Sequence, residues 1–334
     1  MASSQMTRAY PQFSEIPLHP DHPPHSAWGL WGKDHELGTL NHLTPERVVA
    51  AAKEVQTGTR FGLNWALEQM DHTGGFRETI KHEIFQLEDN MNVRLIQLIQ
   101  GYTDHLEDDR ITFNTQTSTQ WDGLRHWGFD DGRFYNGFTQ KEIIENKTPR
   151  LGIQAWAKHG FVGRGVLIDF VSYAAKNNIE YDPLDFYAVP LKTAKQIAKE
   201  CKFEFQAGDI VLLRTGFTTA FEKVSIETKK KIMAKSPFKY PGMERNFEVL
   251  GWLWNTQIAA VAGDCPGFEA WPPSEHALHQ ILLAGFGMPI GEMFALEELA
   301  QECEKQKRWT FMLTSEPLNV RGGVASPPNA LAIM

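Results

Sequence analysis

The feature that most constrains the fold is an alternation of short apolar runs with helical segments in the C-terminal half of the chain. Three apolar runs, each closed by polar residues, are typical of buried strands and lie at 165–169, 209–213 and 258–262. Helical segments are expected at 191–201, 226–235, 243–255, 275–285 and 295–306. Strands that alternate with helices predict an α/β core, in which helices cover a sheet.

The N-terminal half gives weaker signals. Further strands are expected at 91–100 and 111–115, and a helix is expected to begin at Thr44-Pro45-Glu46, where a capping threonine precedes a proline at the first helical position. Five of the first 25 residues are prolines, so residues 1–25 are predicted to form an extended arm, suited to exchange between subunits. Because no linker divides residues 26–334, we expect them to form a single catalytic domain.

Composition excludes several classes of protein. The net charge of -8 argues against a nucleic-acid partner, because phosphate binding needs a basic surface. Three widely spaced cysteines cannot form a disulfide framework and favour a reducing compartment. No secretory signal and no apolar stretch long enough to span a membrane is visible. We therefore expect a cytoplasmic protein without nucleic-acid or membrane partners.

The densest group of functional residue types lies at 115–127. This stretch follows an expected strand and contains amides, hydroxyls, Asp122 and His126. A carboxylate there could bind a metal or orient a base, and a histidine titrates in the range that proton transfer near neutral pH requires. The alternative is that Asp122 caps the following turn and His126 lies at the surface.

Two later stretches carry further candidates. Asp264, Glu269 and Trp271 follow the apolar run at 258–262, although a turn with a packed tryptophan would give the same pattern. His276 and His279 would share one side of a helix, with Glu292 beyond it, a weak indication of metal binding that a structural role explains equally well. Cys265 could be a nucleophile, but no histidine is patterned beside it.

The order of these stretches resembles the cyclase family whose better-known members include kynurenine formamidases, isatin hydrolases and some lactone hydrolases. Beyond the stretch around Asp122, the resemblance rests on the segments 31–45, 163–169, 213–216 and 322–330. It implies an α/β fold of the swivelling β/β/α type, with a mixed β core flanked by helices. It also implies a homo-oligomer, either a dimer or a tetramer.

The family's diagnostic run has the form H-x-G-T-H-x-D-x-P-x-H. Laid on this chain, its aspartate falls on Asp122 and its last histidine on His126, whereas its first two histidines fall on Gln116 and Gln120. Its C-terminal histidine and glutamate match His279 and Glu292. The resemblance therefore implies a metal site made by Asp122, His279 and Glu292, with Gln120 or His126 completing it.

The two glutamines change what this site can hold. A carboxamide oxygen is a weaker ligand for zinc or manganese than imidazole is, so a two-metal site is not expected. Either one divalent metal, zinc or manganese, or a metal-free acid/base site is compatible with the remaining residues. No organic cofactor is expected.

The first hypothesis is a hydrolase that acts on the carbonyl of a small cyclic or aryl amide or ester of lactone type. His126 would act as general base and Asp122 would hold the metal. Substrate-binding residues would be Gln116, Trp121, Trp127, Tyr135, Asp264, Glu269 and Trp271, although many of the aromatic side chains in this part of the chain could instead belong to the core. The alternative is a metal-independent cyclase, lyase or isomerase of natural-product metabolism that uses His126 and Asp122 for proton transfer. A non-catalytic binding protein is a third possibility.

Overall fold

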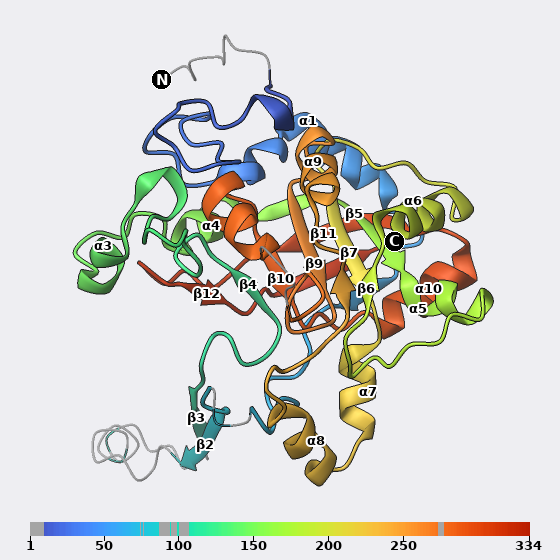
Figure 1. Cartoon of the computed structure of the whole chain (residues 1–334). Coiled ribbons are helices and arrows are strands. Elements are labelled where there is room, and N and C mark those ends of the chain that lie inside the picture. Colours follow the sequence, from blue (N-terminus) through green and yellow to red (C-terminus); the bar gives the residue numbers. More distant parts are fainter. Residues whose placement is uncertain are drawn as a thin grey trace.

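A mixed sheet forms the centre of the molecule. The computed structural model describes residues 10–73, 75, 77–86, 94, 99, 107–272 and 277–334. Within this part of the chain, nine strands pair in the order β1-β13-β11-β5-β7-β9-β10-β4-β12 (Figure 1). In chain order, their bounds are β1 Arg60–Gly62, β4 Gln120–Asp122, β5 Phe161–Asp169, β7 Ile210–Arg214, β9 Ala260–Gly263, β10 Ile290–Glu292, β11 Thr310–Ser315, β12 Ala325–Ser326 and β13 Ala330–Ile333.

The middle of the sheet is parallel and deeply buried. β5, β7, β9 and β10 pair in parallel, and every residue of β9 and β10 is buried. Strands covered on both faces have apolar residues at successive positions, which is why the three apolar runs could be recognised as strands. The flanking pairs β11–β5, β11–β13, β1–β13, β10–β4 and β12–β4 are antiparallel. The expected mixed β core of an α/β fold is confirmed.

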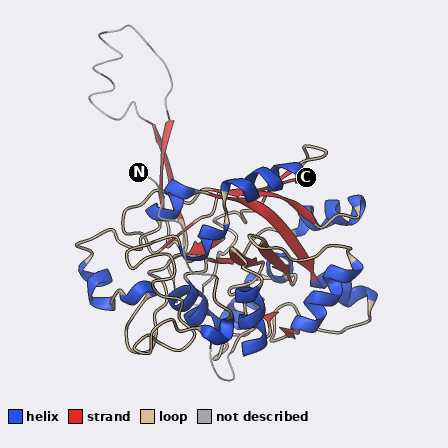
Figure 2. Ribbon diagram, turned by 90° about the horizontal axis from the view of Figure 1, so that it is seen from above, coloured by secondary structure: helices blue, strands red, loops and turns tan. Residues whose placement is uncertain are grey.

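Helices lie on either side of this sheet (Figure 2). The described α-helices are α1 Pro45–Ala51, α3 Gln140–Glu145, α4 Gln154–His159, α5 Phe170–Lys176, α6 Leu191–Glu200, α7 Phe217–Lys223, α8 Ile226–Met233, α9 Phe247–Asn255 and α10 Glu297–Gln306. Short 3-10 turns occupy Phe13–Glu15, Gly38–His42, Ala52–Glu54 and Tyr135–Gly137. None of the helices in the described ranges is long and apolar enough to cross a membrane.

Most of the expected helices begin and end close to where the sequence predicts, whereas α3, α4, α5 and α7 were not expected. α1 begins with Thr44 capping the backbone N–H of Arg47, as the Thr-Pro-Glu pattern indicates. α9 begins four residues later than the expected 243, because Asn246 caps the backbone N–H of Val249. Met243 instead lies in β8 (Gly242–Met243), which pairs with β6 (Ala188–Val189).

The segment 275–285 differs from the expected α-helix. Of its residues, 275 and 276 lie outside the described part of the chain, and Gln280–Phe286 forms a π-helix that ends at Gly287, whose φ is 70°. All the side chains from Ile281 to Phe286 are buried. The wider turn of this helix directly follows His279.

The strand expected at 111–115 is wrong in position. β3 covers Glu107–Thr112 and pairs with β2 (Lys81–Gln86) in a hairpin that projects from the body of the molecule (Figures 1 and 2). Every residue of both strands is exposed, so the alternation of buried and exposed positions that marks a strand in the sequence is missing. Most of the strand expected at 91–100 lies outside the described residues, and the two described positions, Arg94 and Ile99, are helical rather than extended.

Residues 10–25 lie against the chain's own α9. The indole N–H of Trp254 donates to the carbonyl of Pro11 at 2.8 Å, and the side-chain oxygen of Asn255 accepts from the backbone N–H of Phe13 at 2.8 Å. Ile16 is buried, with 6% of its surface exposed. This part of the expected arm therefore packs against α9, at the end of that helix where Trp254 and Asn255 lie.

Candidate active site

Strand β4 places two of the candidate residues on one face of the sheet. Gln120 and Asp122 alternate with Trp121, and successive side chains of a strand point to opposite faces. The antiparallel register with β10 sets Gln120 opposite Glu292. All three polar residues are deeply buried: Gln120 and Asp122 are 0% exposed and Glu292 is 4% exposed.

His279 reaches the same point from the start of the π-helix, and Glu269 fixes its orientation. One carboxylate oxygen of Glu269 lies 2.6 Å from His279 Nδ1, and the other accepts from the His279 backbone N–H at 3.2 Å. Glu269 is itself fully buried. Because the Nδ1 hydrogen is held by Glu269, the second ring nitrogen, Nε2, is directed at β4 and β10.

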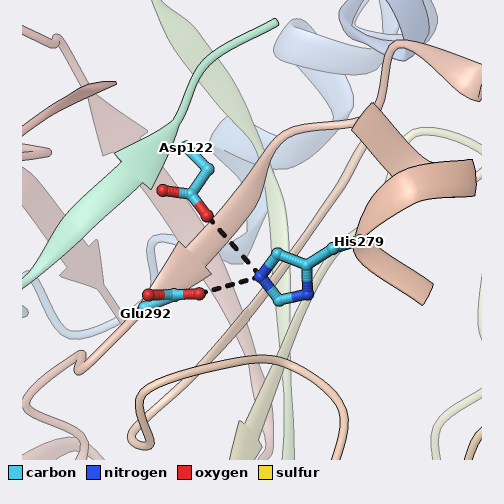
Figure 3. A group of neighbouring side chains, drawn as sticks. All are labelled: Asp122, His279 and Glu292. Atoms are coloured by element: carbon cyan, nitrogen blue, oxygen red, sulfur yellow. Dashed lines mark hydrogen bonds and ion pairs between the residues drawn. The ribbon is translucent and has the colours of Figure 1, made fainter. Parts of the chain in front are cut away.

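Two carboxylate oxygens converge on that nitrogen, which makes three potential ligand atoms in all (Figure 3). His279 Nε2 lies 3.0 Å from Glu292 Oε1 and 3.6 Å from Asp122 Oδ2. One nitrogen or oxygen atom from each of Asp122, His279 and Glu292 lies within 4.8 Å of the others. These three residues form a triad.

The outer oxygens of the two carboxylates are held by the glutamines. Gln116 donates from Nε2 to Asp122 Oδ1, and Gln120 donates from Nε2 to Glu292 Oε2 at 2.5 Å. Gln120 Nε2 also donates to Gln116 Oε1 at 3.2 Å. The amide nitrogen of Gln120 is therefore turned toward Glu292, and its side-chain oxygen has no hydrogen-bond partner.

The charges of the triad are strongly coupled. Burial, followed by the like charge of Asp122, raises the pKa of Glu292 from 4.5 to about 8. Burial alone would raise the pKa of Asp122, but His126 and His279 together hold it below its usual range. For His279 burial acts to lower the pKa, yet the Glu269 carboxylate and the nearby carboxylates of Asp122 and Glu292 raise it well above the usual value. A positive charge between the carboxylates is therefore favoured.

The donor set suits one divalent cation. Asp122 Oδ2 is buried without a hydrogen-bond partner, and buried carboxylate oxygens normally have one. A neutral imidazole nitrogen and two carboxylate oxygens are ligands that zinc and manganese accept. Glu269 supplies the carboxylate that metal-binding histidines commonly hold through their other ring nitrogen. These residues fit a metal ion on the structure's own geometry.

His126 lies at the more accessible side of the triad. Its Nε2 is 3.7 Å from Asp122 Oδ2, and its side chain is 20% exposed, whereas that of His279 is 4% exposed. Burial lowers the pKa of His126 more than the Asp122 carboxylate raises it. The imidazole is therefore neutral near pH 7 and able to accept a proton.

Two tryptophans lie beside the histidines. The ring of Trp127 lies 5.3 Å from that of His279, and Trp271 lies 6.4 Å from Trp127 in an edge-on arrangement. Both indoles are half-buried. The structure thus places Trp127 beside His279 and Trp271 next to Trp127; a substrate-binding role for either remains a prediction.

Three predicted substrate-binding residues lie elsewhere. Trp121 is on the opposite face of β4, where its ring stacks on Phe161 at 4.7 Å in the core. Tyr135 is fully buried in the same core cluster. The Asp264 carboxylate accepts hydrogen bonds from Thr215 and from the backbone N–H of Gly216, so it supports the turn that precedes α7. Each of these side chains is therefore held either by core packing or by hydrogen bonds within a turn.

Two other predicted residues lie at the site in roles that differ from substrate binding. Glu269 is fully buried behind His279, and the amide of Gln116 is committed to Asp122 and Gln120. The hypothesis of a Cys265 nucleophile is not supported, because burial and the neighbouring Asp264 raise the pKa of that thiol well above its usual value.

The sequence reasoning missed two residues near the triad. Tyr240 is buried, its ring stacks with that of Trp271 at 6.4 Å, and the charge of Glu292 contributes to its raised pKa, after burial. Arg77 donates to the backbone carbonyl of Gln116 at 2.6 Å, and its charge acts to lower the pKa of both Glu292 and His126. Neither residue lies in a stretch whose spacing would have pointed to it.

Comparisons with known proteins agree with the resemblance seen in the sequence. A crystal structure described as a novel cyclase is 29% identical, with a TM-score of 0.79, and the match covers 92% of this chain and 99% of that one. Isatin hydrolase A from Labrenzia aggregata, bound to benzyl benzoate, is 18% identical with a TM-score of 0.55 and coverages of 86% and 97%. An isatin hydrolase bound to the product analogue thioisatinate is 18% identical with a TM-score of 0.54 and coverages of 87% and 99%.

The two isatin hydrolases, at 18% identity, show a shared fold alone. Among curated proteins no significant match is found. The family model described as Putative cyclase matches residues 16–270, a span that includes β4 and Glu269. The chain belongs to the Putative cyclase family.

Proposed function

We propose that this chain is a hydrolase that acts on the carbonyl of a small cyclic or aryl amide or ester, with the help of one divalent cation. Membership of the cyclase family supports an enzyme. Two of the structures that share its fold are named as isatin hydrolases, one of them bound to a product analogue. Fold alone does not decide function, so the proposal rests on the site.

The observation that carries the proposal is the convergence of the triad atoms. His279 Nε2, Asp122 Oδ2 and Glu292 Oε1 are directed at one another, and each would bring a lone pair to the same point. Two buried carboxylates next to each other are unfavourable unless a positive charge lies between them. Asp122, His279 and Glu292 would hold the cation, which would polarise the substrate carbonyl and lower the pKa of a water molecule.

His126 would carry out the proton transfers of the reaction. It is neutral near pH 7, and it is the more exposed of the two histidines beside Asp122. His126 Nε2 would take a proton from the attacking water and then give it to the leaving nitrogen or oxygen. Asp122, 3.7 Å from that nitrogen, would stabilise the imidazolium in between. General acid–base catalysis of this kind contributes about 10²–10⁴-fold to the rate.

The half-buried tryptophans favour an apolar, flat substrate. Trp127 and Trp271 offer ring faces and edges beside His279. Aromatic side chains in a site contribute large apolar contact areas and stack on flat rings. This supports a ring-containing amide or ester as the substrate class.

Chelation of the purified protein tests the proposal. Hydrolysis is followed by absorbance for a panel of aryl lactones, cyclic aryl amides and aryl esters, before and after dialysis against a chelator. We expect activity on at least one compound to fall on chelation and to return with Mn²⁺ or Zn²⁺. The variant His126→Asn should lose turnover, whereas His159→Asn, a matched change at the end of α4, should retain it. Full activity after chelation would overturn the metal-assisted mechanism.

A metal-independent cyclase, lyase or isomerase is the second candidate. It is favoured by the hydrogen bonds of Gln116 and Gln120, which satisfy the outer oxygens of both carboxylates, and by a protonated His279 that can bridge the inner ones. In that case His126 and Asp122 would move protons on the substrate without a cation. Turnover of an isomerisable or cyclisable substrate by chelated protein would support it.

A further inference from the structure

Four side chains form a continuous hydrogen-bonded chain around the triad. Gln120 donates to Glu292 Oε2 at 2.5 Å and to Gln116 Oε1 at 3.2 Å, and Gln116 donates in turn to Asp122 Oδ1. All four are buried, with exposed fractions of 0% for Gln120 and Asp122, 4% for Glu292 and 7% for Gln116. The two carboxylates that would bind the cation are thus linked through two carboxamides.

We propose that Gln116 and Gln120 act together as positioning residues that fix Asp122 and Glu292 in the orientation needed to bind a single divalent cation. This inference rests on the proposed function and adds to it how the chain shapes its metal site. Each glutamine takes the outer oxygen of one carboxylate, so that the inner oxygens, Asp122 Oδ2 and Glu292 Oε1, both face His279 Nε2.

The amide orientations are fixed by their neighbours. When both carboxylates are ionised to bind a cation, their oxygens can only accept hydrogen bonds, so the NH₂ group of each glutamine then faces its carboxylate. Gln120 donates one amide hydrogen to the Glu292 carboxylate and the other to the carboxamide oxygen of Gln116. Neither amide nitrogen can bind a cation, so through these nitrogens the two side chains hold Asp122 and Glu292 in position.

Glu269 holds the third member of the triad, His279, through the ring nitrogen that faces away from the two carboxylates. It holds His279 Nδ1 at 2.6 Å, so every member of the triad has its outer atom held by a separate buried side chain. Outer partners of this kind set the orientation and basicity of metal ligands, and their loss costs about 10–100-fold in metal affinity or activity.

The test measures metal binding in the absence of any substrate. The variants Gln116→Leu, Gln120→Leu and the double variant remove the amides with little change in volume. Gln154→Leu is the matched control, because Gln154 is 7% exposed and its amide is also hydrogen-bonded at both ends, to Pro149 and Gly322. Mn²⁺ affinity is measured from the electron paramagnetic resonance signal of the free ion, and the melting temperature of each chelated protein is recorded alongside.

We expect each single glutamine variant to bind Mn²⁺ about 10–100-fold more weakly, with one ion per chain retained. Since both amides belong to one chain of hydrogen bonds, the double variant should lose less than the product of the two single losses. The visible spectrum of bound Co²⁺ should change shape in both single glutamine variants. Gln154→Leu should lower the melting temperature of the chelated protein and leave the Mn²⁺ affinity and the Co²⁺ spectrum unchanged.

Unchanged Mn²⁺ affinity in both glutamine variants, with an unchanged Co²⁺ spectrum, would overturn the inference while leaving metal-assisted hydrolysis intact. A fall in melting temperature with no change in affinity would show a merely structural role and would overturn it as well. By contrast, wild-type protein that hydrolyses its substrate fully after chelation, yet shows weakened Mn²⁺ binding in the variants, would contradict the proposed function and support the positioning role.

Discussion

Replacing Glu292 by glutamine should change how the stability of the metal-free protein depends on pH. Burial and the nearby Asp122 carboxylate raise the pKa of Glu292 from 4.5 to about 8 in the folded protein. The unfolded chain lacks both influences, so there Glu292 loses its proton near its ordinary pKa. Between the two values the folded protein binds a proton that the unfolded chain has released, and raising the pH therefore destabilises the fold.

The size of this effect follows from proton linkage. One additional proton bound in the folded state changes the free energy of unfolding by about 1.4 kcal/mol per pH unit. The stability that Glu292 contributes is fully present below pH 4.5 and is lost as the pH rises to about 8, which amounts to a few kcal/mol. Glutamine does not ionise, so Glu292→Gln has no such loss. At 4% exposure, Glu292 is too buried for solvent to screen the effect substantially.

The assay compares urea unfolding of the chelated wild type and of Glu292→Gln at about pH 5 and at about pH 6.5. Several histidines, His42 and His126 among them, have lowered pKa values in the folded protein and titrate in the opposite sense. Their contributions cancel when the two proteins are compared at each pH. The free energy of unfolding of the wild type should fall by about 2 kcal/mol relative to the variant over this interval. A difference that stays constant would refute the coupled-carboxylate account of the triad.

Three further substitutions test the remaining roles. Asp122→Asn should weaken Mn²⁺ binding by about 100-fold or more, because it removes a ligand charge, and calorimetric titration would detect this; affinity equal to the wild type would exclude Asp122 as a ligand. His126→Gln should leave the metal content unchanged and lower turnover by about 10²–10⁴-fold. In the wild type, turnover should rise with pH as His126 loses its proton, because the general base must be neutral, and the rise should be centred below pH 6.5, the ordinary pKa of histidine. A rise in turnover centred above pH 6.5 would contradict this role of His126. Glu269→Gln should lower Mn²⁺ affinity about 10–100-fold, since a carboxylate no longer holds His279 Nδ1, and an unaltered affinity would show that Glu269 does not orient it.

The sheet was predictable where the structure buries it on both faces. The buried middle strands are covered by helices, so apolar residues run without a polar interruption through residues 165–168 of β5, 210–213 of β7 and the whole of β9. The hairpin of β2 and β3 is exposed throughout, and its mixed polar sequence carries no comparable signal. The late start of α9 follows from the pairing of β8 with β6, a contact between distant segments that local propensity does not encode.

The site was predictable in part, and mainly through resemblance. Asp122, His279 and Glu292 were identified by the order of family-like segments, and the fold brings them within reach of one another. The roles of Glu269, Gln116 and Gln120 depend on hydrogen bonds across the sheet, which residue spacing does not reveal. The position of Trp121 follows from strand geometry, because a side chain between Gln120 and Asp122 in a strand must face away from both.

The central claim is that Asp122, His279 and Glu292 together bind one divalent cation. The most direct measurement is the metal content per chain, determined by elemental analysis after loading with Mn²⁺ and extensive dialysis, for the wild type and for Asp122→Asn. The account predicts one ion per chain in the wild type and none in the variant. Retention of the ion in Asp122→Asn, or its absence from the wild type, would contradict it.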